Sequence, residues 1–474
     1  SLKNVTVDEN VSKINECAFR GTKIEKIELS GGRADADTSL TIAMDAFSDC
    51  NHLENITGGY RVSEVGWYAF DSCVNLKNMD IGMGLKKIDD AFERCRSLRK
   101  ICLSNKIEDI NGGAFSEGAC KELSVEDGSE SYKSIDGCLY KIVDSEKDNL
   151  KLMYAANTTD FKYATPENVT EADMCAFRGR DNIKEIDIGG EIEELSWYSL
   201  INCSNLETLK LSSKLKSFDR DMTAYSFDND LTNLKNIIVD EGNTEYESYN
   251  NELFEKGKKN LILLPYGSDS IVIPKETEYI CGGIAKNKFK NIKVEDGNKY
   301  FSVNSNVLYN KDITEIIIFP SYKTTYTLPA TLKEFPSMTY RYTEDYLDIE
   351  GEAWITRADE NLECVKVAKG NEVYKAVDGV LYLKNTKQLE YYPPAKKGSY
   401  KIIEGTKYVN NAAFIYTKYL TSLTVPDSVK SIIISPKDSE SLKEITVPVK
   451  CEVIKMTKRE GSGVKVYRSL VLKC

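Results

Sequence analysis

Few side chains in this sequence are placed to do acid–base or nucleophilic chemistry. His52 is the only histidine among 474 residues, so a Ser-His-Asp or Cys-His arrangement would have to use it. It lies between Cys50 and Leu53, at a variable position of a segment that recurs along the chain, and we expect it to be a solvated surface side chain. A single histidine also excludes a histidine-rich metal site.

Carboxylates and thiols are abundant, but their spacing indicates no reaction. Among 74 aspartates and glutamates, nothing singles out two as the carboxyl pair of a glycosidase. The 13 cysteines include no C-x-x-C pair, so the spacing of a zinc site is absent. We therefore expect no catalytic residue, no metal and no cofactor, and we predict that the protein is not an enzyme.

The balance of charge argues against nucleic acid as a partner. The chain has 63 basic and 74 acidic residues, a net charge of −11, and 41% hydrophobic residues, which is a folded composition. Both signs are interspersed, with no basic stripe that could follow a phosphate backbone. No apolar run approaches the roughly 18–20 residues that span a bilayer, so we expect no membrane insertion in this segment. The oligomeric state does not follow from the sequence.

The strongest pattern is a recurring Ala-Phe pair. Over its first five copies the phenylalanines are 28, 23, 22 and 23 residues apart, a period typical of solenoid repeats. In a weaker copy, Trp197-Tyr198-Ser199-Leu200 occupies the same place. The pair itself occurs at Ala18-Phe19, Ala46-Phe47, Ala69-Phe70, Ala91-Phe92, Ala114-Phe115, Ala176-Phe177 and Ala413-Phe414.

The residues around the pair follow the rule I-x-x-x-A-F-x-x-C-x-x-L-x-x-I-x-L. Apolar residues spaced by two, such as Ile101 and Leu103, point to one side of a strand. One coil is too small to bury its apolar face, and stacking at about 4.8 Å would bury a continuous core beneath a long parallel sheet. We expect the Ala-Phe pair on the return segment, where alanine permits close packing and phenylalanine fills the coil.

The cysteines of the rule form a column, with Cys50, Cys73 and Cys95 as its clearest members. Cysteine behaves as a small buried hydrophobe. Stacked equivalents would lie about 5 Å apart, which is within the Cα range of a disulfide, but their side chains would point in parallel. We expect buried, stacked thiols, with some bridged pairs as the alternative.

A second kind of unit interrupts the array four times. Each copy has an Asp-Gly or Asn-rich bend, a short apolar segment, a polar turn, and a second apolar strand ending in tyrosine or proline. This pattern predicts a β-hairpin that widens a coil of the same solenoid. The bends with their first strands span 134–140, 249–254, 303–309 and 377–382, and the second strands span 150–154, 261–265, 316–320 and 389–393.

These units resemble the BspA-like, or Treponema-type, leucine-rich repeat, and the interposed D-G-V-L-Y hairpins look like those often found in the same proteins. The resemblance covers most of the chain: it is strong over 5–240, patchier over 241–360 and moderate over 362–450. It implies a secreted or cell-surface protein of a host-associated bacterium or protozoan, with a role in adhesion. The motif contains no catalytic residues. Proline, common after the strand in the family, appears only at Pro426 and Pro448.

We therefore predict a leucine-rich-repeat solenoid, a right-handed superhelix of short parallel strands with little helix and with interposed β-hairpin units. It should form one continuous domain, its signal peptide presumed removed. Its expected segments are regular repeats (1–130), a hairpin unit (131–165), repeats (166–240), hairpin-widened coils (241–330), an irregular aromatic-rich segment (331–361), degenerate repeats with a hairpin unit (362–450) and a C-terminal cap or tail (451–474).

Two groups of side chains are the predicted ligand-binding residues. The first group lies between the buried aliphatics of the strands and should face outward from the sheet: Lys26, Glu28, Asn78, Asp80, Lys100, Glu122, Glu185, Asp187 and Lys210. The second is an aromatic patch in the irregular segment: Tyr340, Tyr342, Tyr346 and Trp354.

The predicted function is non-catalytic binding of an extracellular protein or glycan, for adhesion to a host or neighbouring cell. The alternatives are a structural spacer of a larger surface protein and a carbohydrate-active enzyme with its site in the irregular segment.

Overall fold

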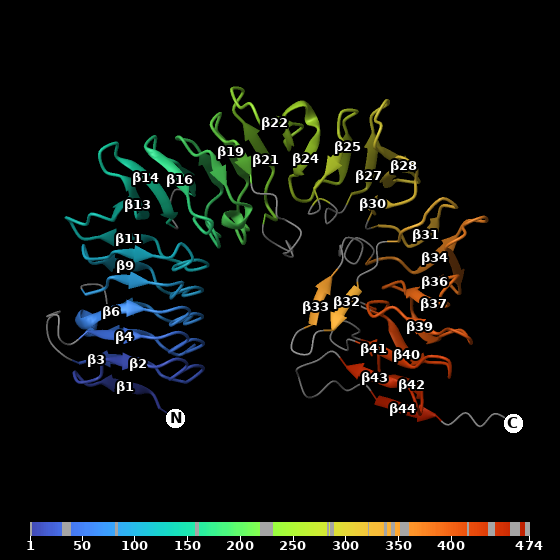
Figure 1. Cartoon of the computed structure of the whole chain (residues 1–474), viewed down its shortest axis with the longest axis horizontal. Helices are drawn as coiled ribbons and strands as arrows, with labels where there is room; N and C mark the ends of the chain where they lie inside the picture. The colour runs from blue at the N-terminus through green and yellow to red at the C-terminus, as the bar shows by residue number, and fades with distance from the viewer. Residues whose placement is uncertain are drawn as a thin grey trace. The chain divides into compact units, whose positions relative to one another are not determined.

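The computed structural model of the chain is a strand-rich solenoid of leucine-rich repeats (Figure 1). The structure describes residues 2–30, 39–80, 84–156, 161–218, 231–281, 284, 289–320, 322–335, 339–342, 347–350, 360–414, 417–434, 441–455 and 465–469, with strands 339–342, 347–350, 452–455 and 465–469 described by their backbone. The chain divides into two compact units, residues 1–257 with 262–266, and residues 258–261 with 267–474.

In the first unit, the I-x-L segments form a first column of parallel strands, as the pattern predicts. Paired strands keep the repeat register, so that Ile27 lies beside Ile56 and Ile186 beside Leu209. Because the inward residues are apolar and the others polar, burial alternates along each strand. The strands are β1 (Asn4–Val7), β3 (Lys26–Leu29), β5 (Asn55–Thr57), β7 (Asn78–Met79), β9 (Lys100–Leu103), β11 (Glu122–Val125), β15 (Lys162–Ala164), β17 (Glu185–Ile188), β19 (Thr208–Leu211) and β21 (Asn236–Val239).

A second column of short strands lies just before the Ala-Phe pairs, where the sequence showed only a single recurring aliphatic. Ile14 pairs with Ile42, and Val65 with Ile88, again in parallel. The strands are β2 (Lys13–Ile14), β4 (Leu40–Ile42), β6 (Val62–Val65), β8 (Lys87–Ile88), β10 (Asp109–Ile110), β16 (Val169–Ala172), β18 (Glu194–Leu195) and β20 (Ser217–Phe218), with 3-10 turns η1 (Gly59–Arg61), η2 (Trp197–Leu200) and η3 (Lys256–Lys258).

Between the two columns, each coil turns through a return segment that carries the Ala-Phe pair. The rings of Phe19, Phe47, Phe70 and Phe92 stack with centroids 5.1–5.2 Å apart, and those of Phe47 and Phe70 are fully buried. Backbone hydrogen bonds tie successive return segments, for example from the N–H of Phe70 to the carbonyl of Ala91 at 2.8 Å. Ala46, Ala69 and Ala91 are buried beside this stack, which agrees with the close packing predicted for alanine, whereas Ala18 in the first coil is exposed.

The cysteine column contributes more than apolar volume. Each thiol donates to the carbonyl of the phenylalanine in the preceding coil: Cys50 to Phe19 at 3.0 Å and Cys73 to Phe47 at 3.2 Å. The described cysteines are free thiols, and burial raises the pKa of Cys73 well above its ordinary value. The thiol is thus a second donor to a carbonyl that already accepts the backbone N–H three residues along, as the Phe47 carbonyl accepts the N–H of Cys50 at 3.2 Å.

Replacing Cys73 with alanine is expected to lower the free energy of unfolding by about 1–2 kcal/mol, because a buried hydrogen bond and a small volume are both lost. Cys73→Ser keeps a donor in the same place and should lose less. Urea denaturation followed by circular dichroism measures both, with the exposed Cys102→Ala as the control. Equal losses for alanine and serine would show that the hydrogen bond contributes nothing.

The predicted hairpins are present in the first unit as antiparallel pairs. Strand β12 (Tyr132–Ile135) pairs with β13 (Cys138–Asp144), which pairs with β14 (Asn149–Tyr154); β22 (Tyr246–Tyr249) pairs with β23 (Glu252–Glu255). The first residue of each hairpin reaches back to the preceding coil. The phenol of Tyr132 accepts the backbone N–H of Ile110 at 2.9 Å, and that of Tyr246 accepts the N–H of Phe218 at 2.8 Å.

Glu252 lies at an apolar position of the second hairpin. The equivalent residues of the other three hairpins are Cys138, Val307 and Val380. Each pairs across the bend with the last residue of the preceding strand, as Glu252 does, and each is buried. Glu252 is only 8% exposed, and its Oε2 has no hydrogen-bond partner among the described residues. Burial alone raises the pKa of its carboxyl to about 7.

Arg180 occupies the cysteine position of the coil that follows the first hairpin unit. It is fully buried, and its guanidinium lies 4.2 Å from the centre of the Tyr154 ring. It donates to the carbonyls of Phe115 at 3.2 Å, Ala155 at 3.4 Å and Arg178 at 3.1 Å. In other coils a cysteine at this position donates to the phenylalanine carbonyl of the preceding coil. Here the hairpin unit lies between the two coils, and the longer arginine side chain makes the equivalent bond to Phe115.

In the second unit, parallel strands and hairpins alternate in the same way. Tyr374 repeats the tyrosine bond described above, accepting the N–H of Phe335 at 2.9 Å. The strands are β24 (Asn260–Leu263), which includes residues of both units, β25 (Ser270–Ile273), β26 (Tyr279–Ile280), β27 (Asn291–Val294), β28 (Phe301–Asn304), β29 (Val307–Asn310), β30 (Ile316–Ile318), β31 (Thr325–Leu328), β32 (Thr339–Tyr342), β33 (Leu347–Glu350), β34 (Cys364–Val367), β35 (Tyr374–Val377), β36 (Val380–Leu383), β37 (Gln388–Tyr391), β38 (Gly398–Lys401), β39 (Tyr408–Val409), β40 (Leu420–Thr424), β41 (Ser431–Ile434), β42 (Glu444–Pro448), β43 (Glu452–Lys455) and β44 (Lys465–Ser469).

Candidate binding site

The predicted sheet-face residues lie on the first column of the first unit, with their side chains exposed or half-buried. The structure brings several of them together across neighbouring strands. Lys100 and Glu122 pair at 2.6 Å, and Lys210 contacts Glu185 at 2.7 Å and Asp187 at 3.8 Å. Hydrogen bonds from Lys210 and Lys162 lower the pKa of Glu185.

Four sheet-face residues belong to the N-terminal sheet. Lys26 and Asn78 flank Asn55 from opposite sides, and Asn78 donates to the Asn55 side chain at 2.7 Å. Glu28 lies two residues along the same strand as Lys26, and Asp80 follows β7. The polar face therefore consists of separate clusters, since Glu185, Asp187 and Lys210 lie beyond the first hairpin unit in another sheet.

The predicted aromatic patch lies outside the residues whose side chains the structure describes. Tyr340 and Tyr342 belong to β32, which pairs with β33 in antiparallel register. For Tyr346 and Trp354, as for these two, a ligand-binding role stays a prediction.

A cleft of about 440 Å³ lies on the return segments of the first unit, where the sequence had predicted no site. It is lined by the residues that immediately precede or replace the Ala-Phe pair in successive coils. They are Trp67, Tyr68, Asp90, Gly113, Met174, Cys175, Trp197 and Tyr198, together with Glu93, Asn111, Ser116, Arg178, Ser196 and Ile201. Its volume is in the range of small-ligand sites.

Two glycines explain the hollow. Most coils place side chains just before the Ala-Phe pair, whereas the coil between Asp90 and Met174 has Gly112 and Gly113 there. A Cβ on Gly112 would lie 1.7 Å from the Asp173 carboxylate, and one on Gly113 would lie 2.4 Å from the Asp90 carboxylate. Side chains at these positions would therefore displace the acidic residues that approach the cleft.

One wall of the cleft is fixed by Arg178. Its guanidinium pairs with Glu93 at 3.2 Å and Glu117 at 2.9 Å, and lies 4.7 Å from the centre of the Tyr198 ring. These contacts join coils on both sides of the first hairpin unit. Burial raises the pKa of Glu93, although the charge of Arg178 opposes the shift.

The opposite wall is aromatic and carries an acid. Trp67 and Tyr68 are 41% and 38% exposed and meet edge to face, with ring centroids 6.1 Å apart. Burial raises the pKa of Tyr68, and the negative charges of Asp90 and Glu93 raise it further. The pKa of Asp90 is itself raised by burial and by the charges of Asp89 and Asp173.

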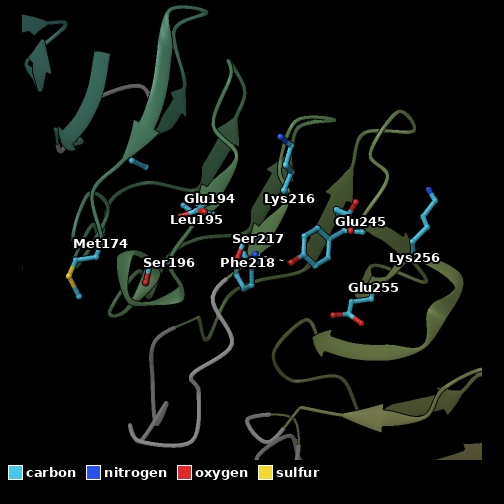
Figure 2. Close-up of a pocket in the computed structure, with 12 residues that line it drawn as sticks. Met174, Glu194, Leu195, Ser196, Lys216, Ser217, Phe218, Glu245, Glu255 and Lys256 are labelled. Carbon is cyan, nitrogen blue, oxygen red and sulfur yellow. Dashed lines mark hydrogen bonds between the residues drawn. The ribbon is translucent and has the colours of Figure 1, made fainter. Parts of the chain in front are cut away.

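A second cavity, of about 710 Å³, adjoins the cleft and shares Met174 and Ser196 with it. Figure 2 shows its charged side chains, among them Lys216, Glu245 and Lys256, standing apart around an open space. Because residues 219–230, which directly follow the lining residue Phe218, lie outside the described part of the chain, we assign no ligand to this cavity.

Sequence reasoning missed the cleft, although a signal was present. The dipeptide Trp-Tyr occurs at Trp67-Tyr68 and again at Trp197-Tyr198, each time at the same repeat position. Between these coils stands the Gly112-Gly113 coil. Large aromatic residues around a side-chain gap on one surface of a solenoid indicate a hollow with aromatic walls.

Among the described residues, no group of three or more histidine, cysteine, aspartate or glutamate side chains could hold a metal ion. Over the same residues, no helix is long and apolar enough to cross a membrane.

Comparison with known proteins identifies the repeat. The BspA type leucine rich repeat region, a model of six copies, matches residues 1–38, 34–141, 154–260 and 396–458. No curated protein sequence shows significant similarity to the chain.

Several solved structures are similar to the chain over nearly its whole length. A leucine rich cell surface protein from Faecalibacterium prausnitzii A2-165 is 13% identical, with a TM-score of 0.27, over 97% of this chain and 89% of that one. The pneumococcal vaccine antigen PcpA is 15% identical, with a TM-score of 0.30, over 99% and 90%. A leucine-rich repeat protein from Bacteroides ovatus is 16% identical, with a TM-score of 0.33, over 96% and 83%.

The family model covers more than half of the chain, and within it the strands pair in parallel with equivalent residues of successive coils side by side. The protein therefore belongs to the family of BspA type leucine-rich repeat proteins.

Proposed function

We propose that this protein is a non-catalytic binding protein of the cell surface or extracellular space. Its partner would be a protein or glycan of a host or neighbouring cell, bound through the polar sheet face. The observation that carries the proposal is the arrangement of Lys26, Glu28, Asn78, Asp80, Lys100, Glu122, Glu185, Asp187 and Lys210 on one column of strands, facing away from the core.

The ion pairs on this face support binding better than they support stability. Lys100 and Glu122 are 64% and 56% exposed, and an exposed pair contributes about 0–1 kcal/mol. Such side chains can exchange their partners for those of a ligand at little cost to the fold. Broad, mixed-charge surfaces of this kind are how solenoids commonly bind.

Screening the purified chain against immobilised extracellular proteins and glycans tests the proposal. For any ligand found, Lys100→Glu combined with Lys210→Glu is expected to weaken binding at least tenfold, because both clusters would then carry uncompensated negative charge. The control is Lys214→Glu, which reverses one exposed partner of an ion pair with Glu191, in a turn outside the strand column. Thermal unfolding should change little in either variant.

Two outcomes would contradict the proposal. The first is the absence of binding to every immobilised protein and glycan, which would favour a structural spacer. The second is a ligand whose dissociation constant is the same for the double variant and the wild type.

A further inference from the structure

The cleft on the return segments contains more negative charge than its own cations neutralise. Every other acid around it has a partner: Glu93 contacts Arg178, Asp71 contacts Arg94 at 2.7 Å, Asp89 contacts Lys87 at 3.2 Å and Asp173 contacts Lys151 at 3.1 Å. Asp90 forms no ion pair among the described residues, and its Oδ1 is buried without a hydrogen-bond partner there.

The aromatic wall supplies a second attraction for positive charge. A cation over the face of tryptophan or tyrosine is stabilised by the ring quadrupole. Trp67 and Tyr68 are both substantially exposed at the cleft, whereas the Tyr198 ring is already covered by the guanidinium of Arg178. The open rings therefore lie on the same side of the site as the unpaired carboxylate, in adjacent coils.

We propose that this cleft binds an organic cation, the ammonium or guanidinium end of a lysine or arginine side chain presented by a protein partner. The cationic end would pair with Asp90, and its alkyl stem would lie against Trp67 and Tyr68. A volume of about 440 Å³ accommodates one such side chain. The protein's own Arg178 is bound in the same way within the cleft, because its guanidinium contacts two carboxylates and the face of an aromatic ring.

This site is independent of the sheet-face function. The cleft is built by return segments, and the sheet face by the first column of strands. A protein partner could use both surfaces, but each can be lost without the other. The experiment below therefore uses small probes that cannot span the two.

The test titrates the full chain with Nα-acetyl-lysine methylamide, with its arginine counterpart, and with Nα-acetyl-norleucine methylamide, which keeps the four-carbon chain of lysine and lacks the ammonium group. Incorporated 5-fluorotryptophan reports binding by ¹⁹F NMR, since Trp67 and Trp197 both line the cleft. Trp67→Phe assigns the first resonance. We expect the cationic probes to shift these resonances with a dissociation constant of about 1 mM, and norleucine to bind at least tenfold more weakly. Free n-butylamine as a fourth probe distinguishes a site for any amine from one that requires the peptide backbone.

Three variants locate the site. Asp90→Asn and Trp67→Ala should each weaken binding of the cationic probes at least tenfold. Gly113→Ala should do the same, because its Cβ would displace the Asp90 carboxylate. The matched control is Asp45→Asn, which occupies the equivalent position two coils earlier and pairs with Arg20 at 3.3 Å. Lys100→Glu on the sheet face should leave probe binding unchanged.

The proposal is overturned if no probe shifts a tryptophan resonance at 50-fold the expected dissociation constant, if norleucine binds as tightly as lysine, or if Asp90→Asn binds like the wild type. Binding of butylamine alone would assign the site to small free amines and would contradict the assignment to a side chain of a protein.

Discussion

Replacement of Arg180 with alanine should lower the free energy of unfolding by about 3–5 kcal/mol, because it removes the largest fully buried side chain among the described residues together with its hydrogen bonds. The carbonyl of Ala155 accepts from Arg180 in the dry interior of the solenoid, and a buried acceptor left unpaired is costly. The Tyr154 ring would also lose the guanidinium that covers it.

Chemical denaturation of the whole chain, followed by circular dichroism, measures this effect as a shift of the transition midpoint. Arg180→Lys keeps the charge, but its donors sit on one nitrogen and cannot reach carbonyls that the forked guanidinium contacts through separate nitrogens. It should therefore fall between alanine and wild type. The exposed Arg20→Ala serves as the control, since its ion pairs are at the surface. A loss below about 1 kcal/mol for Arg180→Ala would show that water or a neighbouring side chain replaces the guanidinium.

Replacement of Glu252 with glutamine should stabilise the protein above pH 7 by up to about 3 kcal/mol, the free energy that corresponds to the rise in the pKa of its carboxyl from 4.5 to about 7. The sign follows from linkage. In the folded chain Glu252 stays protonated up to about pH 7, while in the unfolded chain it ionises near pH 4.5. The wild type therefore loses stability as the pH rises through this interval, and the full penalty is present above it.

The measurement is the difference in free energy of unfolding between wild type and Glu252→Gln at pH 4, 6 and 8, which should grow with pH. Glu252→Val should stabilise further, because valine fills this position in two other hairpins. Glu241→Gln, at an exposed site, should show no such dependence. A difference that is constant with pH would mean that Glu252 is solvated and ionises normally.

The fold was predictable from the sequence because the same pattern of apolar residues recurs in many successive coils. Apolar residues spaced by two, such as Ile27 and Leu29, are buried in a parallel strand as expected, and the hairpins form where Asp-Gly and Asn-rich bends precede apolar runs. Each inference of this kind depends on residues close together in one coil, and the family match confirms the repeat.

The second column of strands was less visible, since strands of two residues such as Lys87–Ile88 leave only one buried aliphatic. The hydrogen bonds of the cysteines were also not evident, because they join a thiol to a backbone carbonyl of another coil.

The two Trp-Tyr pairs and Gly112-Gly113 mark the place of the cleft in the sequence, but its lining depends on which coils become neighbours. Glu117 and Arg178 are 61 residues apart in sequence yet form an ion pair, since the intervening hairpin unit does not separate their return segments. The sequence does not distinguish Asp90 from the other carboxylates, because only the residues packed around it set it apart. The binding roles of the sheet-face residues and of the aromatic residues in 331–361 stay predictions.

The first hairpin unit lengthens only part of the solenoid. Its strand β14 pairs with β16 of the second column, and β15 pairs with β17 of the first column. On the return segments, by contrast, the backbone N–H of Glu117 still donates directly to the carbonyl of Arg178 at 3.2 Å. One side of the stack thus grows by about one strand spacing, roughly 4.8 Å, while the outer return segments do not move apart. A mutation that inserts or deletes such a unit would therefore alter the local curvature of the array while leaving the flanking repeats intact. The curvature is then set by how many hairpin units the gene encodes, and it can evolve separately from the side chains that recognise a partner.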